Sequence, residues 1–144
     1  MAEIIGSILG DSERPLPVIR VDLFNSPLPY IPGSGMPAIF QKNVVALLDT
    51  GSSHGVIDRT LVEKGKLPIL EKGFTETVDA VTHNVNIYLC GVFTDSDRSI
   101  FVGSFVAADL KGQRKPYDLF LGMEFLRYYE MRMDVRKGTL VLSK

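Results

Sequence analysis

Short runs in which apolar and polar residues alternate, each bounded by turn-forming residues, recur along most of this 144-residue sequence. In Val18–Phe24, for instance, every second residue from Ile19 onward is apolar, and charged residues lie between them. A period of two is typical of a strand with one buried face. The closing segment Met131–Leu142 alternates on both sides of Lys137-Gly138, which predicts a β-hairpin.

Helical patterns are few and short. Arg59–Lys64 predicts one helix, in which Thr60 and Glu63 have the spacing of a capping box. Met123–Tyr129 predicts one or two further helical turns. Together with about eight predicted strands, these elements indicate a single small, mostly β, barrel-like domain.

Two segments fall outside the strand pattern. Residues 1–15 are expected to form an N-terminal arm or tail, and the folded domain is expected to span residues 16–144. Asn25–Pro37 contains four prolines and two glycines, a density of helix- and strand-breaking residues that predicts a loop.

Composition and charge exclude several classes of protein. The sequence has 16 Lys and Arg against 17 Asp and Glu, so it lacks the basic surplus of a nucleic-acid-binding protein. One cysteine excludes a disulfide within the chain, and with only two histidines no metal site is expected. No apolar run approaches the roughly 18 residues of a membrane span, and the first ten residues lack the basic lead of a signal peptide. We therefore expect a cytoplasmic protein without metal, cofactor, nucleic-acid or membrane partners.

One segment carries recognisable chemistry. The uninterrupted apolar run Val44–Leu48 predicts a buried strand, and it leads directly into Asp49-Thr50-Gly51-Ser52. A buried strand would hold the carboxylate of Asp49 rigidly at its end, as a catalytic group requires. Gly51 allows a tight turn with a free N–H, and the hydroxyls of Thr50 and Ser52 can brace the loop.

Two further segments strengthen this interpretation. Leu119–Leu126 places two apolar residues and a glycine before a short helix, and Met133–Leu140 forms most of the closing hairpin. With Leu47–Ser53, these segments resemble the retropepsin-like aspartic proteases, that is, the retroviral proteases and their cellular and bacterial relatives. The resemblance extends over roughly Val18–Leu142. It implies a mostly β fold, a small closed acid-protease-type β barrel with one or two short helices, assembled as a homodimer.

The resemblance also implies roles for residues of the Asp-Thr-Gly turn. Asp49 would be the catalytic acid-base, and Thr50 would lock the two turns together across the dimer axis. Gly51 and Ser52 would support the loop. In this family a second segment passes beneath the catalytic turn, and the corresponding residues are Phe120, Leu121 and Gly122.

A flap that closes over the substrate is a further implication of the resemblance. By position the flap would be the hairpin of residues 78–85, with Thr82–Asn84 as a turn. Its tip and substrate-binding residues would be Ala80, Val81, Thr82 and His83.

Aspartic proteolysis requires two carboxylates that share one proton, because two like charges about 3 Å apart cannot both ionise easily. Asp49 is the only aspartate in the sequence that is followed by Thr-Gly or Ser-Gly. One chain therefore supplies half a site. A two-fold homodimer would bring the Asp49 of each chain together, and the substrate would be a peptide or protein bound in extended form.

Other reactive side chains have structural explanations. Ser52 and Ser53 lack the Gly-x-Ser-x-Gly elbow of a serine nucleophile. His54 is expected to be a structural residue, and Cys90 a small buried apolar residue. Several aromatic residues are expected to pack in the core instead of binding a ligand: Phe120, Phe125, Tyr128 and Tyr129.

A second class of function stays open at this point. The same fold could serve as a non-catalytic dimerisation or peptide-binding module. The intact Asp49-Thr50-Gly51 sequence favours the enzyme, whereas a flap tip without glycine favours the module. An RNA-binding small barrel is disfavoured, because the sequence does not cluster basic with aromatic residues.

Overall fold

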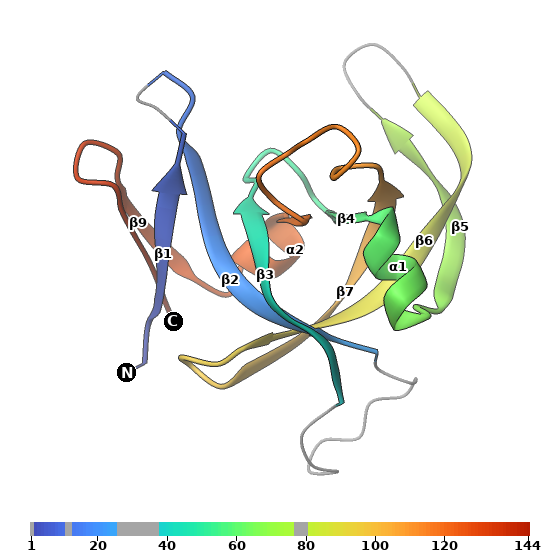
Figure 1. Cartoon of the computed structure of the whole chain (residues 1–144), viewed down its shortest axis with the longest axis horizontal. Coiled ribbons are helices and arrows are strands. Elements are labelled where there is room, and N and C mark those ends of the chain that lie inside the picture. Colours follow the sequence, from blue (N-terminus) through green and yellow to red (C-terminus); the bar gives the residue numbers. More distant parts are fainter. Residues whose placement is uncertain (1, 11–12, 26–37, 77–80) are drawn as a thin grey trace.

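The computed structural model describes residues 2–10, 13–25, 38–76 and 81–144 (Figure 1). Within these ranges the chain forms ten strands and two short helices. In chain order the elements are β1 (Ile4–Leu9), β2 (Leu16–Phe24), β3 (Ile39–Leu48), β4 (Gly55–Asp58), α1 (Arg59–Gly65), β5 (Ile69–Glu76), β6 (Val81–Thr94), β7 (Ser99–Ala108), β8 (Leu119–Leu121), α2 (Met123–Leu126), β9 (Glu130–Asp134) and β10 (Thr139–Ser143).

Six of these strands close into a barrel (Figure 1). The sheet runs in the order β5-β6-β7-β4-β8-β3-β2-β1-β10-β9, and a further pairing between β2 and β6 joins it back on itself. The ring contains β2, β3, β8, β4, β7 and β6, while β5 extends from one side and β1, β10 and β9 from the other. Closure removes the free edges of the six ring strands. The predicted mostly β, closed-barrel fold with two short helices is confirmed.

Alternate residues of the strands fill the interior. In β2 the side chains of Ile19, Val21 and Leu23 are buried, as the alternation predicted. Helix α1 contributes Leu61 to the same core and helix α2 contributes Phe125. Burial of these large apolar side chains is the main force that holds the barrel together.

Strand β8 occupies the central position for the site, because it lies between β3 and β4. It pairs in parallel with β3, with Leu48 opposite Leu121, and antiparallel with β4, with Val56 opposite Phe120. Since β3 and β4 are consecutive in the chain, their connection must cross the end of β8. That connection is residues 49–54, which we call the Asp49 loop.

The N-terminal arm is a strand in this fold. Ile4–Leu9 form β1, which pairs antiparallel with both β2 and β10. Ile4 lies opposite Leu142, so the two ends of the chain are side by side (Figure 1). The division of the chain at residue 15 stays a prediction.

Helix α1 begins in a different way from the prediction. The expected capping box of Thr60 and Glu63 is wrong, because the cap is Asp58, whose carboxylate accepts the Thr60 N–H. Asp58 has extended backbone angles and is 1% exposed. Its other oxygen accepts the N–H groups of Leu110 and Lys111, at 2.9 and 3.0 Å. One buried carboxylate thus joins α1 to the segment after β7.

The turn predicted at Thr82–Asn84 is also wrong. The backbone there continues β6, with Thr82 opposite Thr75 and His83 opposite Phe74 in β5. Residues 77–80, between the two strands, lie outside the described ranges. Strand preference depends on cross-strand neighbours more than on residue type, so polar residues can continue a strand that a partner already pairs.

Candidate active site

Asp49 follows directly after the last residue of β3. Its N–H donates to the carbonyl oxygen of Leu121 at 3.0 Å, which extends the β3–β8 pairing by one residue. Its half-buried side chain accepts the Gly51 N–H at Oδ1, also at 3.0 Å. Among the described residues this is the only hydrogen bond that reaches the carboxylate. Within the described ranges Asp49 Oδ2 has no partner, so it can engage a ligand or a second carboxyl group.

The Asp49 loop rests on the start of helix α2. The N–H of Met123 donates to the carbonyl oxygen of Ser52 at 2.7 Å, and the N–H of Glu124 donates to that of Ser53 at 3.0 Å. A Cβ at Gly122 would lie 2.4 Å from Ser52 O and 2.6 Å from the carbonyl oxygen of His54. Gly122 is therefore a glycine because two backbone carbonyls of the loop occupy the space of a side chain.

The two hydroxyl residues expected to brace the loop, Ser52 and Thr50, differ in their contacts. Ser52 Oγ donates to the carbonyl oxygen of His54 at 2.6 Å, which ties the middle of the loop to its last residue. Thr50 is exposed. An exposed position is what a contact with a second chain requires, and the dimer-locking role of Thr50 stays a prediction.

Tyr117 is a neighbour of Asp49 that the sequence did not reveal. It is 8% exposed, and its ring meets Phe120 edge to face, with centroids 5.1 Å apart. Burial raises the pKa of the Tyr117 hydroxyl, and the negative charge of Asp49 raises it further. Only the parallel pairing of β3 with β8, which no local pattern predicts, brings this tyrosine into the electrostatic range of the carboxylate.

A polar cluster lies at the far end of the Asp49 loop. His54 Nδ1 is 3.1 Å from Glu124 Oε2 and 3.1 Å from Ser104 Oγ. Ser104 also donates to Glu124 twice, through its N–H at 3.1 Å and its hydroxyl at 2.9 Å. His54 was expected to be structural, but its side chain is 64% exposed. The sequence offered no signal for Ser104 or Glu124, which come from β7 and α2.

A cavity of about 870 Å³ opens beside the Asp49 loop. One wall is the second half of the loop with Val56, and the opposite wall is residues 71–74 of β5. Phe105 and Ile87 provide apolar surface between the two walls. We call this space the His54 cavity. Its position between the Asp49 loop and the β5–β6 hairpin is suited to an extended peptide.

The flap residues are placed only in part. Val81 is exposed, and Thr82 and His83 continue the backbone of β6. Ala80 lies outside the described residues. The hairpin that would carry the flap is the β5–β6 pair, whose residues 71–74 line the His54 cavity.

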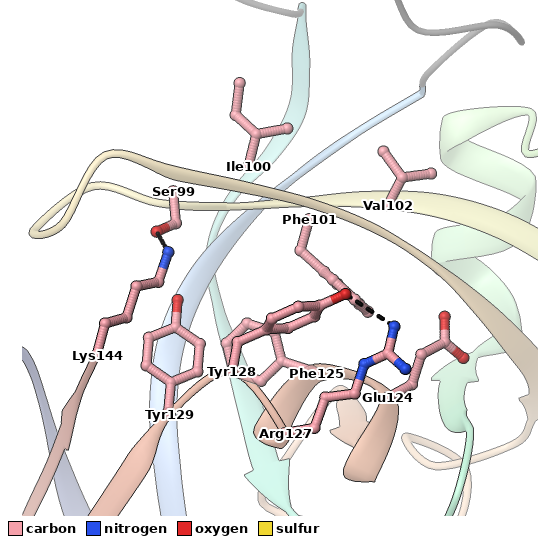
Figure 2. Close-up of a pocket in the computed structure, with 10 residues that line it drawn as sticks. All are labelled: Ser99, Ile100, Phe101, Val102, Glu124, Phe125, Arg127, Tyr128, Tyr129 and Lys144. Carbon is pink, nitrogen blue, oxygen red and sulfur yellow. Dashed lines mark hydrogen bonds between the residues drawn. The ribbon is translucent and has the colours of Figure 1, made fainter.

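A second cavity of about 350 Å³ lies between β7 and helix α2, and Glu124 is one of the residues that line it (Figure 2). Arg127 donates to the Tyr128 hydroxyl at 2.8 Å, and Lys144 donates to Ser99 Oγ at 2.8 Å. Tyr128 is 52% exposed, so its predicted place in the core is wrong. We call this space the Tyr128 cavity.

The predicted packing of Phe125 and Tyr129 is confirmed. Phe125 is 2% exposed and packs against Phe101 and Tyr129, with ring centroids 5.3 and 5.0 Å apart. Tyr129 is half-buried and donates to Asp97 at 3.0 Å. Cys90 is fully buried, as predicted, and burial raises the pKa of its thiol to about 12.

Comparison with solved structures gives matches over most of the chain. A retropepsin-like aspartic protease from Rickettsia conorii has a TM-score of 0.53 and 16% identity, covering 97% of this chain and 89% of that one. The retroviral protease-like domain of Ddi1 from Leishmania major gives 0.49 at 15%, covering 88% and 89%. The EIAV protease complexed with the inhibitor HBY-793 gives 0.45 at 16%, covering 83% and 93%.

No protein-family model and no curated protein matches the chain. The likeness to the rickettsial structure is one of fold. This chain therefore has the fold of the retropepsin-like aspartic proteases, as its Asp-Thr-Gly and Leu-Gly segments indicated. None of the helices within the described ranges is long and apolar enough to cross a membrane.

Proposed function

We propose that this chain is an aspartic endopeptidase that hydrolyses peptide bonds through two Asp49 carboxylates, one from each chain of a homodimer. The observation that carries the proposal is the placement of Asp49. Its carboxylate accepts the Gly51 N–H at the end of β3, Oδ2 has no partner among the residues that the structure describes, and the His54 cavity lies beside the loop. The retropepsin-like fold supports the same assignment.

The need for a second chain follows from the chemistry. The hydrolysis needs one ionised and one protonated carboxyl group in contact. No second carboxylate bonds to Asp49 within the described part of the chain. A two-fold axis beside the Asp49 loop would supply the missing group as a second Asp49, and would bring the exposed Thr50 of each chain to the same axis.

The reaction needs only these two groups and a water molecule. The ionised carboxylate takes a proton from the water molecule while the water oxygen attacks the scissile carbonyl carbon. The protonated carboxyl group donates its proton to the carbonyl oxygen, which gives a neutral tetrahedral diol. Collapse of the diol breaks the C–N bond: one diol hydroxyl returns its proton to the second carboxylate as the carbonyl forms, and the proton on the first carboxyl group passes to the leaving amine. The dyad ends with one proton, as it began.

Substrate binding would use the walls of the cavity. An extended peptide would lie between the Asp49 loop and the β5–β6 hairpin, and its backbone would pair with strand edges. Ala80, Val81, Thr82 and His83 would contact it as the flap, and Phe120, Leu121 and Gly122 would support the loop from below. For the location of the protein in the cell, we propose the cytoplasm, as expected from the sequence.

The decisive experiment replaces Asp49 with asparagine. We expect Asp49→Asn to lose peptidase activity by far more than the ~10²–10⁴-fold effect of one proton transfer, because the water would then lack its base. The exposed Asp95 offers a matched control, and Asp95→Asn should keep full activity. Both variants should sediment as dimers. Full activity in Asp49→Asn, or in a protein that sediments only as a monomer, would refute the proposal.

The non-catalytic module remains the second candidate, since the flap sequence 80–84 has no glycine. A peptide mimic with a hydroxyethylene group in place of the scissile bond separates the two. An active dyad should bind it and raise the melting temperature through mass action, and Asp49→Asn should abolish that shift. A peptide-binding module would bind the mimic and the ordinary peptide equally, with or without Asp49.

A further inference from the structure

The two ring nitrogens of His54, at the edge of the proposed substrate site, differ in their hydrogen bonding. Its Nδ1 lies 3.1 Å from Glu124 Oε2. An ionised carboxylate can only accept hydrogen bonds, so the contact requires a proton on Nδ1. In the part of the chain that the structure describes, Nε2 of His54 has no hydrogen-bond partner. The side chain is 64% exposed and lines the His54 cavity.

The carboxylate that orients the ring is itself held in place. Glu124 Oε1 accepts the Ser104 N–H at 3.1 Å, and Oε2 accepts the Ser104 hydroxyl at 2.9 Å. The backbone N–H of Glu124 donates to Ser53 in the Asp49 loop. Since β7, α2 and the loop all contribute, the ring is held in a defined orientation without using Nε2. A free nitrogen on an oriented ring is a group that can select a ligand.

Charges around the ring determine what it can select. Glu124 faces it from α2, Glu71 and Lys72 line the same cavity from β5, and Asp49 lies at the other end of the loop. When the ring is protonated, its charge balances that of Glu124, and Lys72 offsets Glu71. Nε2 then carries a proton that points away from Glu124, and an incoming carboxylate would meet a charged donor.

Two general properties, one of histidine and one of an aspartic dyad, bear on when the ring can select a carboxylate. Histidine ordinarily changes charge between pH 5 and 8. An aspartic dyad works in mildly acidic solution, where its two carboxyl groups hold one proton. A protonated ring offers Nε2–H as a charged donor to a carboxylate, whereas a neutral ring with its proton on Nδ1 offers only an acceptor at Nε2.

We propose that His54 is a specificity-determining residue of the peptidase site. Through Nε2–H it selects substrates with a carboxylate side chain at the position that enters the His54 cavity, and Glu124 is the positioning residue that fixes its tautomer. This inference rests on the proposed function and adds the class of substrate. Neutralising the ring removes the preference for glutamate over glutamine.

The test uses peptide pairs that differ by glutamate or glutamine at one position, scanned along the substrate. Wild-type protein should favour glutamate about five-fold in kcat/KM near pH 5.5 at one position, since a charge-assisted hydrogen bond exceeds a neutral one but this site is partly exposed. At a higher pH, at which the ring is neutral, the ratio should approach one. His54→Leu should bring it to about one at both pH values. Tyr128→Ala, in the Tyr128 cavity, should leave both the ratio and the activity unchanged.

A ratio in His54→Leu that equals the wild-type ratio at every position would overturn the proposal. Nitrogen NMR of the imidazole provides a direct measurement, since His83 is the only other histidine. Wild-type His54 should have its proton on Nδ1 in the neutral ring, and Glu124→Gln should give a mixture of tautomers and a weakened ratio. A proton found on Nε2 alone in the neutral wild-type ring would also refute the inference.

The experiment separates this inference from the proposed function. The same peptide pairs can be titrated by calorimetry into Asp49→Asn, which should bind without cleavage. If wild-type protein cleaves no peptide yet Asp49→Asn binds the glutamate peptide more tightly, the peptidase proposal fails and the role of His54 stands. If cleavage occurs but neither measurement depends on His54, only the role of His54 fails.

Discussion

Replacing Gly122 with alanine adds a single methyl group at the point where the Asp49 loop crosses β8. The new Cβ would lie 2.4 Å from Ser52 O and 2.6 Å from His54 O, both of them backbone atoms. Contacts of Cβ atoms below 3.0 Å essentially do not occur, so the loop must retreat by about 0.6 Å. Gly122 has a φ of −94°, which any residue can adopt, so the effect is one of space alone.

The size of the effect follows from what that movement disturbs. Overpacking of this kind typically costs about 1–3 kcal/mol, and we expect the upper end because two rigid carbonyls are displaced together. For a domain of this size, 3 kcal/mol corresponds to a loss of roughly 6–12 °C in melting temperature. Activity should fall further, by about 10²-fold, because a misplaced carboxylate cannot meet its partner.

Differential scanning calorimetry and a peptidase assay at a temperature where the variant is folded would measure the two effects separately. Gly73→Ala is the matched control for stability, since its Cβ would meet only the flexible end of Ile87 at 2.6 Å. We expect that control to change stability by less than about 1 kcal/mol. Wild-type melting temperature and turnover in Gly122→Ala would refute the reasoning.

Two further predictions concern buried groups away from the loop. Burial opposes ionisation of Asp58, but hydrogen bonds from Thr60, Lys111 and Leu110 outweigh it and hold the pKa of the carboxyl below its usual 3.8. The stabilisation is therefore complete above about pH 4 and is lost as pH falls through the lowered value, so Asp58→Asn should cost about 2–4 kcal/mol at pH 7 and progressively less in acid. Urea titrations at several pH values would measure this, and a cost that does not depend on pH would contradict it. Because burial raises the pKa of Cys90 to about 12, a thiol reagent at pH 8 should label the native protein no faster than it unfolds; rapid labelling would mean that the barrel opens locally.

Local patterns in the sequence predicted the secondary-structure elements and the position of Asp49 at the end of a strand. Alternation in β2 predicted which side chains are buried, because a strand turns every second residue to the same face. An apolar run before Asp49-Thr50-Gly51 predicted a carboxylate at a strand end. Gly122 was predicted to lie beneath the loop from its resemblance to a known segment, and the crossing of β8 by the Asp49 loop gives the physical reason.

Only the tertiary structure decided which distant residues meet. The parallel pairing of β3 with β8 brings Tyr117 near Asp49, and the packing of α2 beside β7 brings Glu124 and Ser104 to His54. Such contacts depend on strand order and register, which are set by the lowest free energy of the whole barrel. A sequence read locally carries information about neighbours along the chain, whereas these neighbours are up to 70 residues apart.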